Sequence, residues 1–118
     1  STPDDDLAKP FTILDKEEQA VFSAAHQFFK SQVGKAKDNK ETLLSSLGFV
    51  SMFLGKFEEG EKYYEALYEE RKTFNHFENL ILISLVLKKW NETEVLLQES
   101  ATVYQNTRAQ LQLMSLYD

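Results

Sequence analysis

The chain contains no cysteine, and only two prolines and four glycines stand among its 118 residues. The lack of cysteine excludes disulfides and thiol chemistry, and it fits a cytoplasmic protein. Both prolines, Pro3 and Pro10, lie in the first fourteen residues beside an aspartate run. Because proline interrupts helices, its absence after position 10 leaves long stretches free to be helical. We expect residues 1–14 to form a flexible tail and residues 15–118 to form one helical domain.

Basic residues are few, with 13 Lys and Arg against 19 Asp and Glu, and the net charge is −6. No segment is basic, which argues against a nucleic-acid partner, because binding to a phosphate backbone depends on clustered Lys and Arg. Long apolar runs are missing as well. None approaches the roughly 18 to 20 residues that cross a bilayer, so membrane insertion is not expected.

Signs of catalysis or metal binding are also sparse. The two histidines, His26 and His76, have no partner at metal-ligand spacing, and we interpret them as polar residues on helix surfaces. Six glutamates between positions 58 and 70 alternate with aromatic residues, a pattern typical of a solvated helix face. There is no phosphate-binding loop or nucleophile elbow. We expect no enzyme activity, no metal and no cofactor, and a small-molecule enzyme is the weakest of the alternatives.

Apolar residues recur at steps of three and four through most of the chain, which predicts helices. The predicted helices cover residues 15–34, 38–54, 57–72, 75–88, 91–104 and 107–117. Four acidic or amide residues precede a glutamate by three positions, the spacing of a capping box. These pairs are Asp15–Glu18, Asp38–Glu41, Asn75–Glu78 and Asn91–Glu94.

The stretch 47–70, LGFVSMFLGKFEEGEKYYEALYEE, predicts two helices joined by a tight turn. Gly48 and Gly60 lack a Cβ and allow close helix packing, and Gly55 can adopt the positive φ common after a helix. The order of large, small and aromatic residues resembles one tetratricopeptide (TPR) unit.

A degenerate second copy follows at an offset of about 33 residues, one short of the usual TPR period of about 34. We call this offset one repeat. It matches Leu47 with Leu80 and Leu54 with Leu87, and a further step places Leu113 at the start of a third unit. The sequence therefore predicts an all-α, TPR-like helix-turn-helix stack (an α-solenoid) of about six helices.

In such a stack the first helix of each unit lines a concave groove. We expect this groove to bind a protein partner through Phe49, Met52, Phe53, Leu82, Leu85 and Val86. The alternative is that the first helix covers Phe49, Met52 and Phe53 as ordinary core. The last predicted helix is apolar around most of its circumference. Its Leu111, Met114 and Tyr117 are expected to meet a second copy, a heteromeric partner or a helix beyond Asp118.

The stretch 47–70, the segment FENLILISLVLKKWNETEVLLQES and the closing helix are similar to units of the TPR-type chaperones of bacterial type III secretion. The resemblance implies a cytoplasmic chaperone that holds an apolar helix or extended peptide of a secreted protein. Two features depart from it: one long helix replaces the upstream unit, and ERKTFNHF between the units has no proline. The alternative function is a scaffold subunit that docks a larger assembly.

Overall fold

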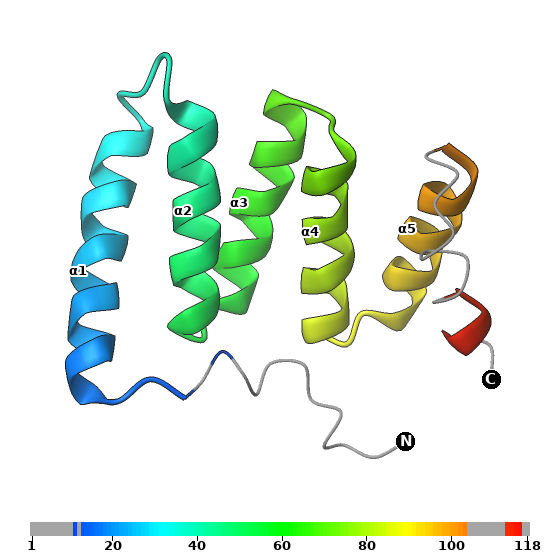
Figure 1. The fold of residues 1–118 in the computed structure, drawn as a ribbon, viewed down its shortest axis with the longest axis horizontal. Coiled ribbons are helices and arrows are strands. Elements are labelled where there is room, and N and C mark those ends of the chain that lie inside the picture. The colour runs from blue at the N-terminus through cyan, green and yellow to red at the C-terminus, as the bar shows by residue number, and fades with distance from the viewer. Residues whose placement is uncertain (1–10, 12, 104–112, 117–118) are drawn as a thin grey trace.

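The protein is a single row of helices. The computed structural model describes residues 11, 13–103 and 113–116, and within them lie α1 (Lys16–Val33), α2 (Lys40–Phe53), α3 (Phe57–Glu70), α4 (Phe74–Val86) and α5 (Trp90–Val103). A sixth helical segment covers residues 113–116. Among the five labelled helices, close backbone contact joins only neighbours in the sequence (Figure 1). The predicted all-α stack of six helices is confirmed.

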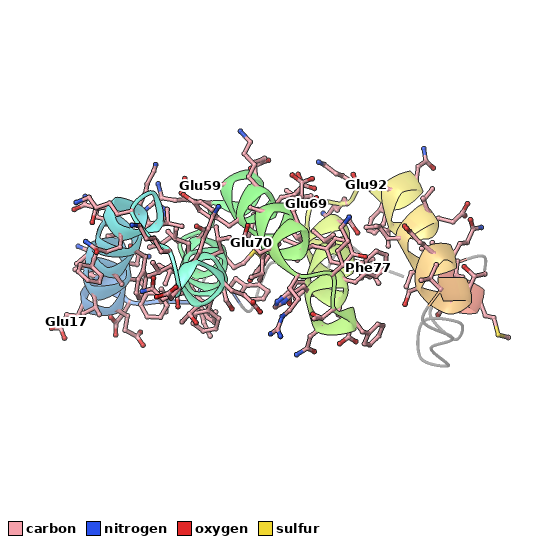
Figure 2. All side chains as sticks on the ribbon, turned by 90° about the horizontal axis from the view of Figure 1, so that it is seen from above. Glu17, Glu59, Glu69, Glu70, Phe77 and Glu92 are labelled. Atoms are coloured by element: carbon pink, nitrogen blue, oxygen red, sulfur yellow. The ribbon has the colours of Figure 1, made fainter. Side chains whose placement is uncertain are left out.

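Viewed along the helix axes, the row alternates between two layers from α2 to α5 (Figure 2). Figure 2 shows α2 and α4 in one layer and α3 and α5 in the other. Consecutive helices run in opposite directions, so α2 and α4 point the same way and their N-terminal ends lie at the same edge (Figure 1). This arrangement gives α2 and α4 a common outer side, which we call the α2/α4 face.

The turn between α2 and α3 is a Schellman motif centred on Gly55. Gly55 has φ +75°, and its N–H donates to the Met52 carbonyl at 3.0 Å. The next N–H, from Lys56, donates to the Ser51 carbonyl at 2.8 Å. The predicted left-handed turn at Gly55 is therefore confirmed.

The same turn recurs one repeat later with lysine in place of glycine. Lys88 has φ 59°, and its N–H donates to the Leu85 carbonyl at 3.0 Å. The Lys89 N–H donates to the Ser84 carbonyl at 2.9 Å, just as Lys56 does to Ser51. Since a non-glycine residue is strained at positive φ, the repeated turn geometry overrides the local preference of Lys88. The backbone thus repeats where the sequence has diverged.

Helices α2 and α3 meet through small residues. A Cβ built on Gly48 would lie 2.5 Å from Cε1 of Tyr64, so the tyrosine ring occupies the space that any side chain at position 48 would need. One built on Gly60 would lie 3.4 Å from Sδ of Met52. Leu47 and Leu67 are fully buried beside this contact. The close approach predicted from the two glycines is confirmed.

The second unit has its own core, with Phe77, Ile81 and Leu97 buried between α4 and α5. Ile81 and Leu97 stand one repeat after Gly48 and Tyr64. In the first unit a glycine packs against a tyrosine, whereas at the equivalent positions of the second unit an isoleucine stands with a leucine of similar size. Leu113 and Leu116 pack on the same cluster, which attaches the sixth helical segment to the stack.

One predicted helix start is confirmed. The Asp15 carboxylate accepts the Glu18 backbone N–H at 2.8 Å, and the Glu18 carboxylate accepts the Asp15 N–H at 3.1 Å, which completes a capping box at α1.

The other three predicted caps are wrong by one or two residues. α2 is preceded by Asn39, whose side chain makes no capping bond, and α4 is capped by the Thr73 hydroxyl, which accepts the His76 N–H at 3.2 Å. α5 begins at Trp90, directly after the Lys88 turn. None of the described helices is long and apolar enough to cross a lipid bilayer.

Candidate functional site

The α2/α4 face carries two exposed apolar side chains at equivalent positions. Phe49 of α2 is 52% exposed, and Leu82 of α4, one repeat later, is 37% exposed. Because the two helices repeat the same geometry, these side chains point to the same side of the stack. Contiguous exposed apolar surface marks an interaction site, and Phe49 and Leu82 are the candidates for such a surface on α2 and α4.

An aromatic cluster extends this face toward α1. The Phe49 ring lies 4.9 Å from that of Phe53, and the Phe22 ring of α1 lies 6.5 Å from Phe49 and 5.6 Å from Phe53 (centroid distances). Phe11 closes the cluster with an edge-on contact of 5.2 Å to Phe53. The first helix therefore partly covers Phe53, which is half-buried, as the alternative interpretation expects. Phe49 stays open to solvent.

Two residues predicted to line the groove lie instead in the core. Met52 is 1% exposed and Val86 is 6% exposed, and both pack in the cluster that contains Leu44, Tyr64 and Ile83. Met52 follows the exposed Phe49 by three residues, which places its side chain roughly 60° around the helix from that of Phe49 and turns it toward α3. There its sulfur approaches the helix backbone of α3. For Met52 and Val86 the predicted role in partner contact is corrected to a packing role.

The remaining predicted contacts lie toward the end of the stack. Leu85 is half-buried and lines a pocket of about 210 Å³ with Leu97, Ser115 and Leu116. Met114, one repeat after Ile81, is exposed where Ile81 is buried. Leu111 and Tyr117 lie outside the described residues. Met114 thus keeps the accessibility that its predicted contact with another chain requires.

The other end of the α2/α4 face is polar. A shallow pocket of about 420 Å³ lies at the N-terminal ends of the two helices and is lined by Asp38, Glu41, Thr42, Ser45, Ser46, Arg71 and His76. At its centre one Glu41 oxygen lies 2.9 Å from Arg71 Nη2 and 2.9 Å from His76 Nε2. The hydrogen bond with His76, and after it the one from Arg71, holds the pKa of Glu41 below its ordinary value.

His26 links α1 to α3 and is buried, so its interpretation as a helix-surface residue is wrong. Its Nε2 lies 2.5 Å from Glu59 Oε2, which also accepts the Tyr63 hydroxyl at 2.8 Å. His76 similarly links α4 to α2 through Glu41. Each histidine therefore joins helices two places apart in the row, which the backbone contacts do not join. The burial of His26, though not its partner, could have been inferred from the sequence, because His26 shares the inward stripe of Phe22, Phe29 and Val33.

The hydrogen bonds at Glu59 shift the pKa of Glu59 itself and that of Tyr63. Partial burial would raise the pKa of Glu59, but the bonds from Tyr63 and His26 outweigh it and leave that pKa lowered. Burial, followed by the bond to the Glu59 carboxylate, raises the pKa of Tyr63 to about 12. The group is thus a neutral phenol, a carboxylate and a histidine, placed to join helices.

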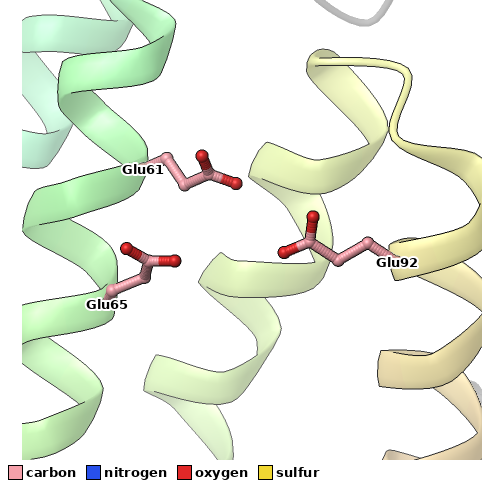
Figure 3. Close-up of side chains that lie close together, drawn as sticks. All are labelled: Glu61, Glu65 and Glu92. Atoms are coloured by element: carbon pink, nitrogen blue, oxygen red, sulfur yellow. The ribbon is translucent and has the colours of Figure 1, made fainter.

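Three carboxylates gather on the opposite layer, where Glu61 and Glu65 of α3 meet Glu92 of α5 within 4.8 Å (Figure 3). Partial burial, and then repulsion from Glu61 and Glu92, raises the pKa of Glu65. The Lys89 ammonium lies 2.8 Å from Glu61 and 3.9 Å from Glu92, and the bond to Glu61 raises the pKa of Lys89. Lys89 thus supplies positive charge to the three carboxylates. We interpret the group as an ion-pair network that links α3 to the start of α5.

Comparison with known proteins adds no relative. No family model matches the chain, and no curated sequence or solved structure is significantly similar to it. The α2/α4 face is therefore the candidate site on geometry alone: an apolar half with Phe49 and Leu82 and a polar half around Glu41.

Proposed function

We propose that this chain is a non-catalytic protein-binding module of the TPR type, whose α2/α4 face binds an apolar helix or extended peptide of a partner protein. One observation carries the proposal: Phe49 and Leu82 stand one repeat apart and both remain exposed on neighbouring helices of one layer. A partner segment that crosses α2 and α4 would bury both side chains. At roughly 25 cal/mol per Å², each would contribute about 1 to 2 kcal/mol to binding.

Within this class the favoured role is a cytoplasmic chaperone that shields an aggregation-prone segment of a secreted or assembly-destined protein. The support is Phe49, which stands exposed at the edge of the aromatic cluster that it forms with Phe11, Phe22 and Phe53, because an aromatic side chain offers a large apolar contact surface to a client. The similarity to type III secretion chaperones favours a client of that export route. The second candidate is a scaffold subunit, favoured by the polar pocket around Glu41, which could orient one defined partner.

Co-purification of partners from the native lysate tests the proposal. We expect Phe49→Glu and Leu82→Glu each to reduce partner recovery at least tenfold, because each places a charge in the buried interface. Val95→Glu is the matched control, since Val95 is 59% exposed but lies on α5, outside the face. Helical circular dichroism should be unchanged in all three variants.

The outcomes separate the candidates. A client that aggregates when released from the chain supports the chaperone, whereas a stable stoichiometric assembly supports the scaffold. Equal recovery with Leu82→Glu, Phe49→Glu and Val95→Glu would remove the α2/α4 face from the function.

A further inference from the structure

The outer side of α1 carries an apolar stripe that nothing in the described chain covers. Val21, Ala24 and Phe28 are all exposed, and Phe28 is 59% exposed. They lie on the side of α1 away from Phe22 and Val33, which pack inward. Figure 2 shows Glu17, one turn before Val21, at the outer edge of the stack. This stripe is separate from the α2/α4 face.

The stripe has the same spacing as a helix-packing stripe elsewhere in this chain. In α3, Phe57, Gly60 and Tyr64 stand at positions i, i+3 and i+7, and Gly60 and Tyr64 form the close contact with α2. In α1, Val21, Ala24 and Phe28 repeat the spacing with a small residue at the same place. The outer side of α1 thus has the residue spacing of the α3 surface that packs against the antiparallel helix α2.

We propose that a second copy of this chain covers the stripe, with the two α1 helices antiparallel about a twofold axis at Ala24. In an antiparallel pair the residue numbers of facing positions have a constant sum. With Ala24 opposite its own copy, Phe28 faces Ala20 of the second copy, as Tyr64 faces Gly48 between α3 and α2. Ala20 and Ala24 are small enough for this close crossing. Such a contact is self-complementary, as a twofold interface must be.

Charge at the ends of the stripe favours the antiparallel pair. Glu17 lies before the stripe and Lys35 after it, and both are exposed. With Ala24 on the axis, Glu17 of one copy faces Ser31 of the other, and Lys35, two residues beyond the end of α1, lies about one helical turn further along. A parallel arrangement would place like charges side by side. One helix pair buries a small area, so the dimer should be reversible and depend on concentration.

Sedimentation velocity over a wide range of concentration tests the dimer with the whole chain. The parent should shift from the 13.7 kDa monomer to twice that mass as its concentration rises. Phe28→Glu should remain monomeric and keep its melting temperature, because Phe28 is largely exposed. Val95→Glu, the control of equal exposure on α5, should dimerise like the parent. A monomeric parent at every concentration, or a dimer that survives Phe28→Glu, would overturn the proposal.

Two further variants report on the geometry rather than on mere association. Because the chain has no cysteine, Ala24→Cys introduces a single thiol. It should form a disulfide-linked dimer at least tenfold faster than Val95→Cys under mild oxidation, since facing Cβ atoms at the crossing approach bonding distance. Glu17→Lys should weaken the dimer, and Glu17→Lys with Lys35→Glu should restore it. Equal cross-linking rates, or no restoration by the charge reversal, would contradict the antiparallel pairing.

Discussion

The contact between Gly48 and Tyr64 allows the packing of the first unit to be tested quantitatively. A Cβ at position 48 would stand 2.5, 2.8 and 2.9 Å from three atoms of the buried tyrosine ring, so Gly48→Ala forces the ring or the helix to move. Overpacking of this kind costs about 1 to 3 kcal/mol. Alanine in a helix interior returns about 0.5 to 1 kcal/mol relative to glycine. The expected net loss of unfolding free energy is about 1 to 2 kcal/mol, and Gly48→Leu should be far worse.

A double-mutant cycle isolates the contact. Tyr64→Leu, which copies Leu97 of the second unit, leaves a cavity and should cost about 1 to 3 kcal/mol by itself. In the double variant the new Cβ enters the space that the ring vacated. The double variant should therefore lose at least about 1 kcal/mol less unfolding free energy than the sum of the losses in the two single variants. Urea denaturation followed by circular dichroism measures all four free energies of unfolding.

Gly34→Ala is the control, because nothing lies within 4 Å of its added Cβ and its φ of −70° suits alanine. A thermal melt gives the same comparison, with about 4 °C expected per kcal/mol for a chain of this size. Should Gly48→Ala prove as stable as Gly34→Ala, or the cycle show simple additivity, the close crossing of α2 and α3 would be wrong.

Three further predictions concern the turns, the buried hydroxyls and the ion pairs. Lys88→Gly should raise the free energy of unfolding by roughly 0.5 to 1 kcal/mol, because glycine adopts the positive φ without strain; a lower melting temperature would contradict this. Ser51→Ala should stabilise by about 1 kcal/mol because its buried hydroxyl lacks a partner among the described residues. Ser84→Ala should instead destabilise by a similar amount, since it loses the bond to the Ile81 carbonyl; urea midpoints in the reverse order would refute both. The folded pKa of Glu59 lies below its unfolded value of about 4.5, so its contribution to the free energy of unfolding is fully present above about pH 4.5 and is lost as the pH falls through the folded pKa. Glu59→Gln should therefore lower the stability at neutral pH and make the stability fall less steeply in acid. An unchanged pH profile of the urea midpoint would exclude a stabilising role for the Glu59 carboxylate.

The repeat could be predicted because its strongest signals are local. Gly48, Gly55 and Gly60 each perform a backbone task that other residues perform poorly, and the sequence places them at the spacing of a helix hairpin. The second unit lacks all three glycines, yet Lys88 adopts the same turn as Gly55. Tertiary packing imposed that turn, and it could only be inferred from the offset between the two units.

Side-chain direction was harder to predict than the fold. The repeat register predicts Met52 and Val86 on the groove, but an error of one position around a helix changes the direction of a side chain by about 100°. Thr73 displaced Asn75 as the cap of α4 for a similar reason: several capping residues stand close together, and the packing of the helix selects one. The bonds that His26 and His76 make depend on helices two places apart, which no local pattern encodes.

Site-specific photo-cross-linking in the native cell tests whether one partner segment crosses both α2 and α4. A photoreactive side chain is placed singly at Phe49, Leu82 or Val95, and cross-linked partners are identified by mass spectrometry. If the α2/α4 face binds one segment across both units, positions 49 and 82 should capture the same protein and position 95 should not. Different proteins at 49 and 82, or the same protein at all three positions, would contradict the binding of one segment across both units.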